Sequence, residues 1–292
     1  VALSYGPSGL DLPALWERKR VVIEQTRGLS VHRGTERFAD IIGQESVKAR
    51  LRTRIGARTP IGVVVLMDEI DKAFANVEHD TSGVKLDQML TFLTEMENNE
   101  WRGMVAVGVD GGGKTLLGKA FGNEAGVPMI KMDFGAMEAP HVGESEMLVR
   151  QVIATIKAIG RGYAYFIATS NNASVMRPEM QRRFTDGMFF FDLMTEPERA
   201  ATWAYYMQKY DLPAQPIPPD NGWTGAEIRN CCRDAWDTRV TLVDAARFIV
   251  PMATSRAKDI EDLRRAANGA FLDANKPGPY VYDPEPMKPM LR

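Results

Sequence analysis

The segment Gly108–Thr115, which reads Gly-Val-Asp-Gly-Gly-Gly-Lys-Thr, limits the possible folds of this chain more than any other feature. It matches the pattern Gly-x-x-x-x-Gly-Lys-Ser/Thr, after the apolar run Met104–Val107 and before an expected helix Lys114–Ala125. Glycines let backbone N–H groups surround a polyphosphate, and a helix N-terminus favours negative charge. The alternative is a glycine-rich turn with a chance lysine. The strand and helix on either side favour a phosphate-binding loop.

Each position of this loop has an expected contact. Lys114 should reach the terminal phosphates of a nucleotide, and the hydroxyl of Thr115 should ligate Mg²⁺. The other expected nucleotide contacts come from the loop and the first helical turn: Asp110, Gly111, Gly112, Gly113 and Leu116.

An acidic pair, Asp68 and Glu69, follows the unbroken apolar run Val63–Met67. Such a run is typical of a strand that is buried on both faces. Two carboxylates at the end of a buried strand are costly unless they serve a cation or a proton transfer. We therefore expect Asp68 to hold Mg²⁺ through water and Glu69 to polarise the water that attacks the γ-phosphate. The alternative is an acidic surface turn.

Composition excludes several classes of protein. The 292 residues are 45% hydrophobic and 25% charged, with a net charge of −2, which is typical of a globular protein without a general attraction to nucleic acid or anionic lipid. No apolar run is long enough to span a membrane, and no signal peptide is evident. The only cysteines, Cys231 and Cys232, are adjacent, so neither a disulfide framework nor a metal site is indicated. We expect a cytoplasmic protein.

Short β-rich runs alternate with amphipathic helical stretches between residues 61 and 192, which predicts an α/β fold with a parallel sheet. The expected strands are Val63–Met67, Met104–Val107, Met129–Met132, Tyr163–Thr169 and Met188–Phe191. After Thr195 the pattern is helical. The predicted organisation is an N-terminal helical appendage, a nucleotide-binding α/β domain, a small all-α lid and a Pro-rich extended or disordered tail: 1–36, 37–195, 196–272 and 273–292.

Basic and imidazole side chains outside these motifs are expected to be solvated. A helix capped by Ser46 and ending near Ile55 carries Lys48, Arg50, Arg52 and Arg54 at a spacing that scatters them around its surface. His32 and His79 have no partner at ligand spacing, so we interpret them as exposed loop residues.

Three further segments, with the two motifs above, resemble ATPases of the AAA+ superfamily, in the clade with a helical lid, over roughly residues 37–272. The first, Phe38–Gly43, resembles the motif that contacts adenine, and this implies that Asp40, Ile41, Ile42 and Gly43 bind the base. The second, Ile167–Asn171, resembles the sensor-1 strand and implies that Asn171 orients the attacking water, with Asn172 as the alternative. In the third, Met180–Phe184, the resemblance implies that Arg182 and Arg183 are arginine fingers, and a surface ion pair is the alternative.

The lid segment Gly222–Ile228 also resembles this family and implies that Gly225 and Ala226 contact the nucleotide. Ala226 stands where other AAA+ proteins have a second-sensor arginine, and Arg229 is more simply a helix-face residue than a substitute. The run from Val250 to Arg265 resembles poorly characterised bacterial and plastid-encoded members of the family.

The family's pore loop has an aromatic residue before Val-Gly-Glu, whereas this chain has Pro140, His141 and Val142. An imidazole offers less apolar area than Tyr or Trp, which places the threading of unfolded polypeptide in doubt. His141 as an ordinary loop residue and His141 as a partner contact are equally compatible with the sequence.

The order of blocks departs from the family. Block 61–100, with the acidic pair, precedes block 101–162, with the phosphate loop and pore loop, whereas family members have the reverse order. Exchanging the blocks restores ordinary joints at 60–61, 100–101 and 162–163. We predict the family's usual sheet in space, with the sensor-1 strand between the two others. Either the chain is transposed or the numbering is not the covalent order, and we favour the second explanation.

The resemblance implies an Mg²⁺-dependent ATP hydrolase that forms a homo-oligomeric ring, with hexamer the expected state. Active sites would be shared between subunits. The ring would remodel a macromolecular partner, and protein is favoured over nucleic acid. A nucleotide-switched assembly platform without threading and a nucleic-acid-loading protein are the alternatives, and the last requires side chains such as Arg50 and Arg54 to line the channel.

Overall fold

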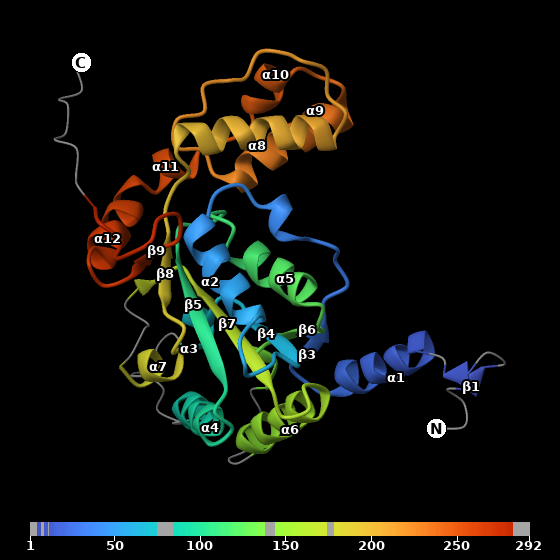
Figure 1. Ribbon diagram of the computed structural model, residues 1–292. Coiled ribbons are helices and arrows are strands. Elements are labelled where there is room, and N and C mark those ends of the chain that lie inside the picture. The colour runs from blue at the N-terminus through green and yellow to red at the C-terminus, as the bar shows by residue number, and fades with distance from the viewer. Residues whose placement is uncertain are drawn as a thin grey trace. The chain divides into compact units, whose positions relative to one another are not determined.

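The computed structural model describes residues 5–6, 9–10, 12–74, 84–137, 144–173 and 178–282 (Figure 1). The chain divides into two compact units that are interleaved in sequence. The first unit comprises Val1–Ile41, Lys48–Val107 and Gly113–Met188, and the second comprises Ile42–Val47, Gly108–Gly112 and Phe189–Arg292. The predicted domains were consecutive ranges, and their bounds stay predictions.

The central sheet has seven strands in the order β3-β6-β4-β7-β5-β8-β9. These strands are β3 (Leu29–Val31), β4 (Val63–Met67), β5 (Arg102–Gly108), β6 (Met129–Met132), β7 (Ala164–Ser170), β8 (Met188–Phe191) and β9 (Leu272–Asp273). β4 pairs in parallel with β6 and β7, and β5 pairs in parallel with β7, whereas β3 is antiparallel to β6. Every residue of β4 and β7 is buried, as expected of parallel strands covered on both faces. The predicted α/β class is confirmed.

Helices connect these strands in the part of the chain that precedes β8. They are α1 (Leu12–Gln25), α2 (Glu45–Ile55), α3 (Ile70–Phe74), α4 (Val84–Asn98), α5 (Lys114–Ala125), α6 (Glu144–Ile159) and α7 (Pro178–Arg183), with 3-10 turns η2 (Phe38–Asp40) and η3 (Gly135–Met137). A short antiparallel pair, β1 (Tyr5–Gly6) and β2 (Gly9–Leu10), precedes α1. α4 packs against α6, and α5 packs against β4. No helix among the described residues is long and apolar enough to cross a membrane.

Strand β7 lies between β4 and β5, which is the spatial order predicted for exchanged blocks. The chain passes from α4 to β5 through a tight turn, in which Glu100 has φ 52 and Trp101 N donates to Met96 O at 2.9 Å. The three joints also lie together, since residues 59–61, 99–102 and 163–165 line one cavity of about 110 Å³. The starts of β4, β5 and β7 are therefore neighbours, and each preceding segment can reach more than one of them. Which explanation of the block order holds stays a prediction.

The C-terminal part of the second unit is helical, as predicted. It contains α8 (Glu196–Lys209), α9 (Gly225–Thr238), α10 (Leu242–Ala246), α11 (Met252–Ser255) and α12 (Ala257–Ala267). Its core contains the indoles of Trp203 and Trp223, whose ring centroids lie 5.7 Å apart. Both cysteines are free thiols buried in this core, where low polarity favours the neutral thiol.

The first part of the predicted extended tail is instead folded. β9 pairs with β8, and Ala274 N donates to Phe190 O at 3.1 Å. The hydroxyl of Tyr280 donates to Asp192 Oδ2 at 2.6 Å, and burial with this carboxylate raises the pKa of Tyr280. The prolines did not prevent pairing because the backbone bonds come from other residues of the segment. Residues 283–292 lie outside the described part of the chain.

Several side chains expected in solvent are engaged. Ser46 lies inside α2 rather than at its cap, because α2 begins at Glu45. Lys48 is buried, and its Nζ donates to Ile41 O at 2.6 Å. Arg54, with a side chain only 12% exposed, lies 3.1 Å from the buried carboxylate of Asp186. The prediction that the basic residues of this helix are all solvated was therefore wrong, because Lys48 donates to a backbone carbonyl and Arg54 forms an ion pair with a buried carboxylate.

His32 was also predicted to be solvated, and this was wrong. Its Nε2 lies 2.7 Å from Glu36 Oε2, and its side chain is 13% exposed. The amide of Asn123 donates to the carbonyls of Gly34 and Glu36, which holds the intervening loop. His79 lies outside the described residues.

Candidate functional site

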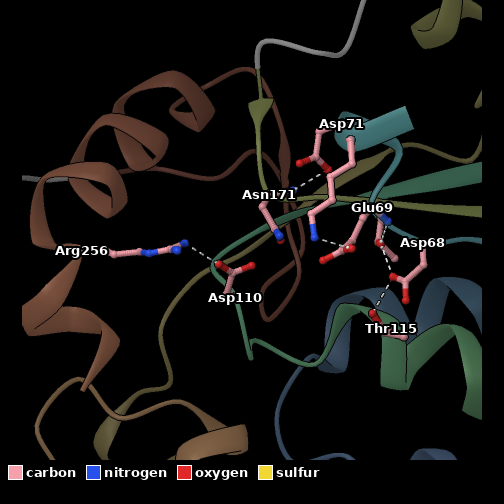
Figure 2. A network of polar contacts seen from close by, with 9 residues as sticks. Asp68, Glu69, Asp71, Asp110, Thr115, Asn171 and Arg256 are labelled. Atoms are coloured by element: carbon pink, nitrogen blue, oxygen red, sulfur yellow. Dashed lines mark hydrogen bonds and ion pairs between the residues drawn. The ribbon is translucent and has the colours of Figure 1, made fainter. Parts of the chain in front are cut away.

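The carboxylate of Asp68 is the centre of the candidate site (Figure 2). Its Oδ1 accepts a hydrogen bond from Thr115 Oγ1 at 2.7 Å and another from Thr169 Oγ1 at 2.6 Å. Asp68 follows β4, Thr115 is the second residue of α5, and Thr169 lies near the end of β7. Because β4 and β7 are parallel neighbours, their carboxyl ends meet at one edge of the sheet. This topology brings together an acid and a hydroxyl that lie far apart in the chain.

Glu69 occupies a turn with unusual backbone geometry. Its φ is 52, a left-handed conformation that non-glycine residues adopt rarely. The Glu69 N–H donates to Thr169 Oγ1 at 3.0 Å, so the same hydroxyl holds both acidic residues. The Glu69 carboxylate is 47% exposed and lies 2.7 Å from Lys72 Nζ. The base expected from the sequence is therefore accessible and ion-paired.

Asn171, the expected sensor residue, follows the end of β7. Its backbone N–H donates to Asp71 Oδ1 at 3.3 Å, in the turn of α3 (Figure 2). Asn172, the alternative, instead exchanges hydrogen bonds with the hydroxyl of Ser170, whose Oγ donates to Asn172 O at 2.9 Å. The segment after β7 is thus connected to the segment after β4 through Asp71.

The phosphate loop has the backbone that its glycines permit. Gly111 has φ 73 and Gly113 has φ 90, both in the left-handed region. A Cβ at Gly111 would lie 2.8 Å from Thr224 Oγ1, so this position also requires a residue without a side chain. Lys114 is buried at 6% exposure in the first turn of α5, followed by Thr115 and Leu116. The loop thus presents backbone N–H groups, a lysine and a hydroxyl.

The expected adenine-contacting residues lie in both units. In the first, the carboxylate of Asp40 accepts from Arg37 N at 2.7 Å, and Ile41 is buried. In the second, Gly43 has φ 75, and a Cβ there would clash with Glu198, whereas Ile42 precedes it on the connecting segment.

Gln44, which sequence reasoning missed, follows these residues in the second unit. Its Nε2 donates to the phosphate-loop carbonyl of Gly112 at 2.7 Å, and its backbone N–H donates to Asn275 Oδ1 at 2.5 Å. The carbonyl can only accept, so the Gln44 amide nitrogen must face it. Gln44 therefore ties the residues after η2 to the loop.

The lid motif forms the N-terminus of α9. Thr224 is the N-cap and accepts from Glu227 N at 3.4 Å, while Glu227 Oε2 accepts from Thr224 N at 2.7 Å. Gly225 and Ala226 form the first turn of this helix. A Cβ at Gly111 would lie 3.1 Å from the Ala226 Cβ, so the helix start packs directly on the phosphate loop within the second unit.

Arg182 and Arg183 end the short helix α7. Arg183 Nη2 forms an ion pair with Glu97 of the same chain, on α4. Arg182 is exposed. The alternative reading of Arg183, an ion pair, is thus present in the monomer, and a role toward a neighbouring subunit stays a prediction. Pro140, His141 and Val142 of the expected pore loop lie outside the described residues.

The structure adds residues that the motifs did not predict. Thr169 and Arg256 connect segments that are distant in sequence, and Lys72 pairs with Glu69, three residues before it. The position of Thr169, two residues before Asn171 on an expected strand, was the only available signal, since strand ends of parallel neighbours meet. No group of three or more His, Cys, Asp or Glu side chains within the described ranges could hold a metal ion.

Part of this chain is similar in sequence to known proteins. Residues 104–161 match the model of the ATPase family associated with various cellular activities (AAA). The match lies within block 101–162. An uncharacterized AAA domain-containing protein, ycf46, of Guillardia theta is 26% identical over 232 residues, covering 59% of this chain and 45% of that protein. Its counterpart in Pyropia yezoensis is 24% identical over 233 residues, covering 60% and 47%. The chain spans about half the length of these curated relatives.

Two solved structures are also similar. The FIGL-1 AAA domain in complex with ADP has a TM-score of 0.43 and 14% identity, covering 85% of this chain and 97% of that one. A structure from a study of katanin self-assembly has a TM-score of 0.41 and 16% identity, covering 85% and 89%.

Proposed function

We propose, from the premise that this chain is an ATPase of the AAA+ superfamily, that it hydrolyses ATP at the Asp68–Thr115 site and transmits the resulting motion to a macromolecular partner. The observation that carries the proposal is the 2.7 Å hydrogen bond between Thr115 and Asp68. It joins the phosphate loop to the acidic pair although the chain presents them in an unusual order. A chance glycine-rich turn would have no reason to meet this carboxylate.

The residues fit an Mg²⁺–triphosphate. A hydroxyl and a carboxylate are the oxygen ligands that Mg²⁺ prefers, and left-handed glycines precede a buried lysine at a helix N-terminus. Thr115 and Asp68 would hold the metal, which when bound would neutralise charge on the phosphate oxygens. Lys114 and the amides of Gly111 and Gly113 would hold the phosphates, and the Gly112 amide would join them on leaving the Val109 carbonyl, to which it donates at 3.2 Å.

Glu69 would accept a proton from the attacking water, whose oxygen bonds to the γ-phosphorus as the bond to the bridging oxygen breaks. Asn171 would orient that water. To accept this proton, the Glu69 carboxylate must either separate from Lys72 or reach the water while it is still paired with Lys72. The hydroxyl of Thr169 accepts from the Glu69 N–H and so holds the turn in place. Arg183, after release from Glu97, and Arg182 would stabilise transition-state charge on a neighbouring subunit's nucleotide in a ring, for which a hexamer is the proposed state.

A protein partner is favoured over nucleic acid. Arg50 and Arg54, the residues that a nucleic-acid channel would need, are both engaged by Asp186, at 2.9 and 3.1 Å. The net charge of −2 adds no general attraction to phosphate backbones. Cytoplasmic residence remains part of this proposal.

Substitution of Glu69 by Gln tests the mechanism. The variant should bind ATP as tightly as the wild-type chain and hydrolyse it at least about a hundredfold more slowly, because an amide cannot accept the proton. Glu124→Gln, which changes a carboxylate in the last turn of α5, is the matched control. Unchanged turnover in Glu69→Gln would remove Glu69 from the mechanism.

The Lys72–Glu69 ion pair favours a second candidate, a nucleotide-switched assembly platform that binds ATP and turns it over slowly. The two candidates differ in kinetics. A remodelling enzyme should show an ATPase rate per chain that rises with protein concentration and with an unfolded-protein substrate. A platform should assemble with ATP and show neither increase.

A further inference from the structure

The phosphate loop of this chain contains a carboxylate, Asp110, directly before its three glycines. A nucleoside triphosphate is strongly anionic, and a fixed negative charge beside the phosphate loop opposes its binding. Asp110 Oδ2 lies 2.9 Å from Arg256 Nη1 (Figure 2). The carboxylate is 32% exposed and the guanidinium 59% exposed, so the pair contributes little to folding. The two charges can still act on a bound triphosphate, because the phosphates would bind next to them.

The position of Arg256 depends on α9, the helix whose start contacts the phosphate loop. It lies between α11 and α12, and its N–H donates to Met252 O at 2.8 Å. Met252 N in turn donates to Glu227 Oε1 at 2.7 Å, and Glu227 belongs to the capping box of α9. The start of α9 packs on Gly111 through Thr224. All these residues belong to the second unit, which includes Gly108–Gly112.

We propose that Asp110 and Arg256 form an electrostatic gate on the nucleotide site: Asp110 opposes triphosphate binding, and Arg256 cancels that opposition when the α11–α12 segment is in place. Nucleotide affinity is thereby linked to the position of this C-terminal segment. By reciprocity, a bound triphosphate stabilises the segment's contact with the loop. The inference rests on the proposed ATP binding at this loop and adds its regulation.

The charges predict a pattern of affinities. Arg256→Gln leaves the Asp110 charge unbalanced and should weaken ATP binding about tenfold at low salt, with a smaller loss for ADP because it carries less charge. Asp110→Asn removes the opposing charge and should tighten ATP binding by a similar factor. The double variant has neither charge and should return close to wild-type affinity. Arg256→Lys keeps the charge and should retain most of the affinity.

Isothermal titration calorimetry with ATP and ADP, in Mg²⁺ at about 0.05 and 0.5 M salt, measures these affinities. The differences should shrink at high salt because the charges are partly exposed. The matched control is Arg265→Gln, on the adjacent helix α12 and paired with Glu261 at 2.9 Å, which should bind ATP normally. Thermal unfolding without nucleotide identifies any variant that fails to fold.

Rescue of Arg256→Gln by Asp110→Asn supports the gate. Two outcomes overturn it: wild-type affinity in Arg256→Gln, or a double variant as weak as Arg256→Gln, since the arginine would then act without Asp110. Wild-type chain and Lys114→Ala are titrated first. If the wild-type chain binds no ATP, the proposed function fails and the gate with it. If the wild-type chain binds ATP and Lys114→Ala does not, ATP binds at this loop, and the variants of Asp110 and Arg256 then test the gate separately.

Discussion

The hydroxyl of Thr169 should be the most informative single group to remove. It donates to Asp68 at 2.6 Å and accepts from the Glu69 N–H at 3.0 Å, and Thr169 is only 2% exposed. Thr169→Val keeps the β-branched shape that suits strand β7 and deletes both bonds. A hydrogen bond to a charged group contributes about 1.5–3 kcal/mol, and an unsatisfied donor costs about 1–3 kcal/mol. Water can reach the exposed Asp68 carboxylate and part of the Glu69 turn, so the lower ends of both ranges apply. We expect Thr169→Val to lower the free energy of unfolding by about 2–3 kcal/mol.

Urea unfolding followed by circular dichroism measures this loss, with Thr169→Ser as the control that keeps the hydroxyl. ATP turnover in Thr169→Val should also fall, because Asp68 and Glu69 lose their common partner, and the serine variant should recover most of it. If the free energy of unfolding of Thr169→Val lay within about 0.5 kcal/mol of the wild-type value, the change would be no larger than that of a neutral surface substitution. That result would refute the view that this hydroxyl organises the site.

The remaining predictions concern the loop, the thiols and the chain order. Gly111→Ala should weaken ATP binding and lower the unfolding temperature, because an alanine at φ 73 is strained and its Cβ would press on Thr224, and calorimetry and thermal unfolding measure the two effects. Burial raises the pKa of Cys231 to about 11 and that of Cys232 to about 12, so a thiol reagent at pH 8 should label neither until urea unfolds the chain. The stability from these neutral thiols should be complete below about pH 8.5 and fall as the pH rises toward 11, and rapid native labelling would contradict this. Mass spectrometry of a proteolytic peptide that crosses residues 100–101 shows whether the printed order is covalent, and its absence beside a peptide joining 60 to 101 would establish the other order.

The strands and the site's first contact could be predicted because they follow from local pattern. Val63–Met67 and Met129–Met132 were predicted to the residue, since continuous apolar runs of this length are typical of buried strands. Asp68 meets Thr115 because both follow parallel strands, whose carboxyl ends share an edge.

Other elements could not be predicted because they depend on distant residues. β3 has three residues and β9 has two, and each is a strand only through its pairing with β6 or β8. Nothing near Arg256 or Gln44 in sequence indicates a contact with the phosphate loop, since folding alone brings them there. The same holds for Lys48, whose buried ammonium donates to the carbonyl of Ile41.

The order of the strands in the sheet has a consequence for synthesis. Val64 pairs with Met129 and Val63 with Ala164, so in a chain that is covalently joined in the numbered order β4 leaves the ribosome long before either neighbour exists. Until then Val63–Met67 is an uncharged, β-branched segment with both edges open, the kind of sequence that pairs with other copies of itself. Nascent chains stalled before β6 should therefore aggregate or bind a holdase chaperone, whereas chains stalled after β7 should not.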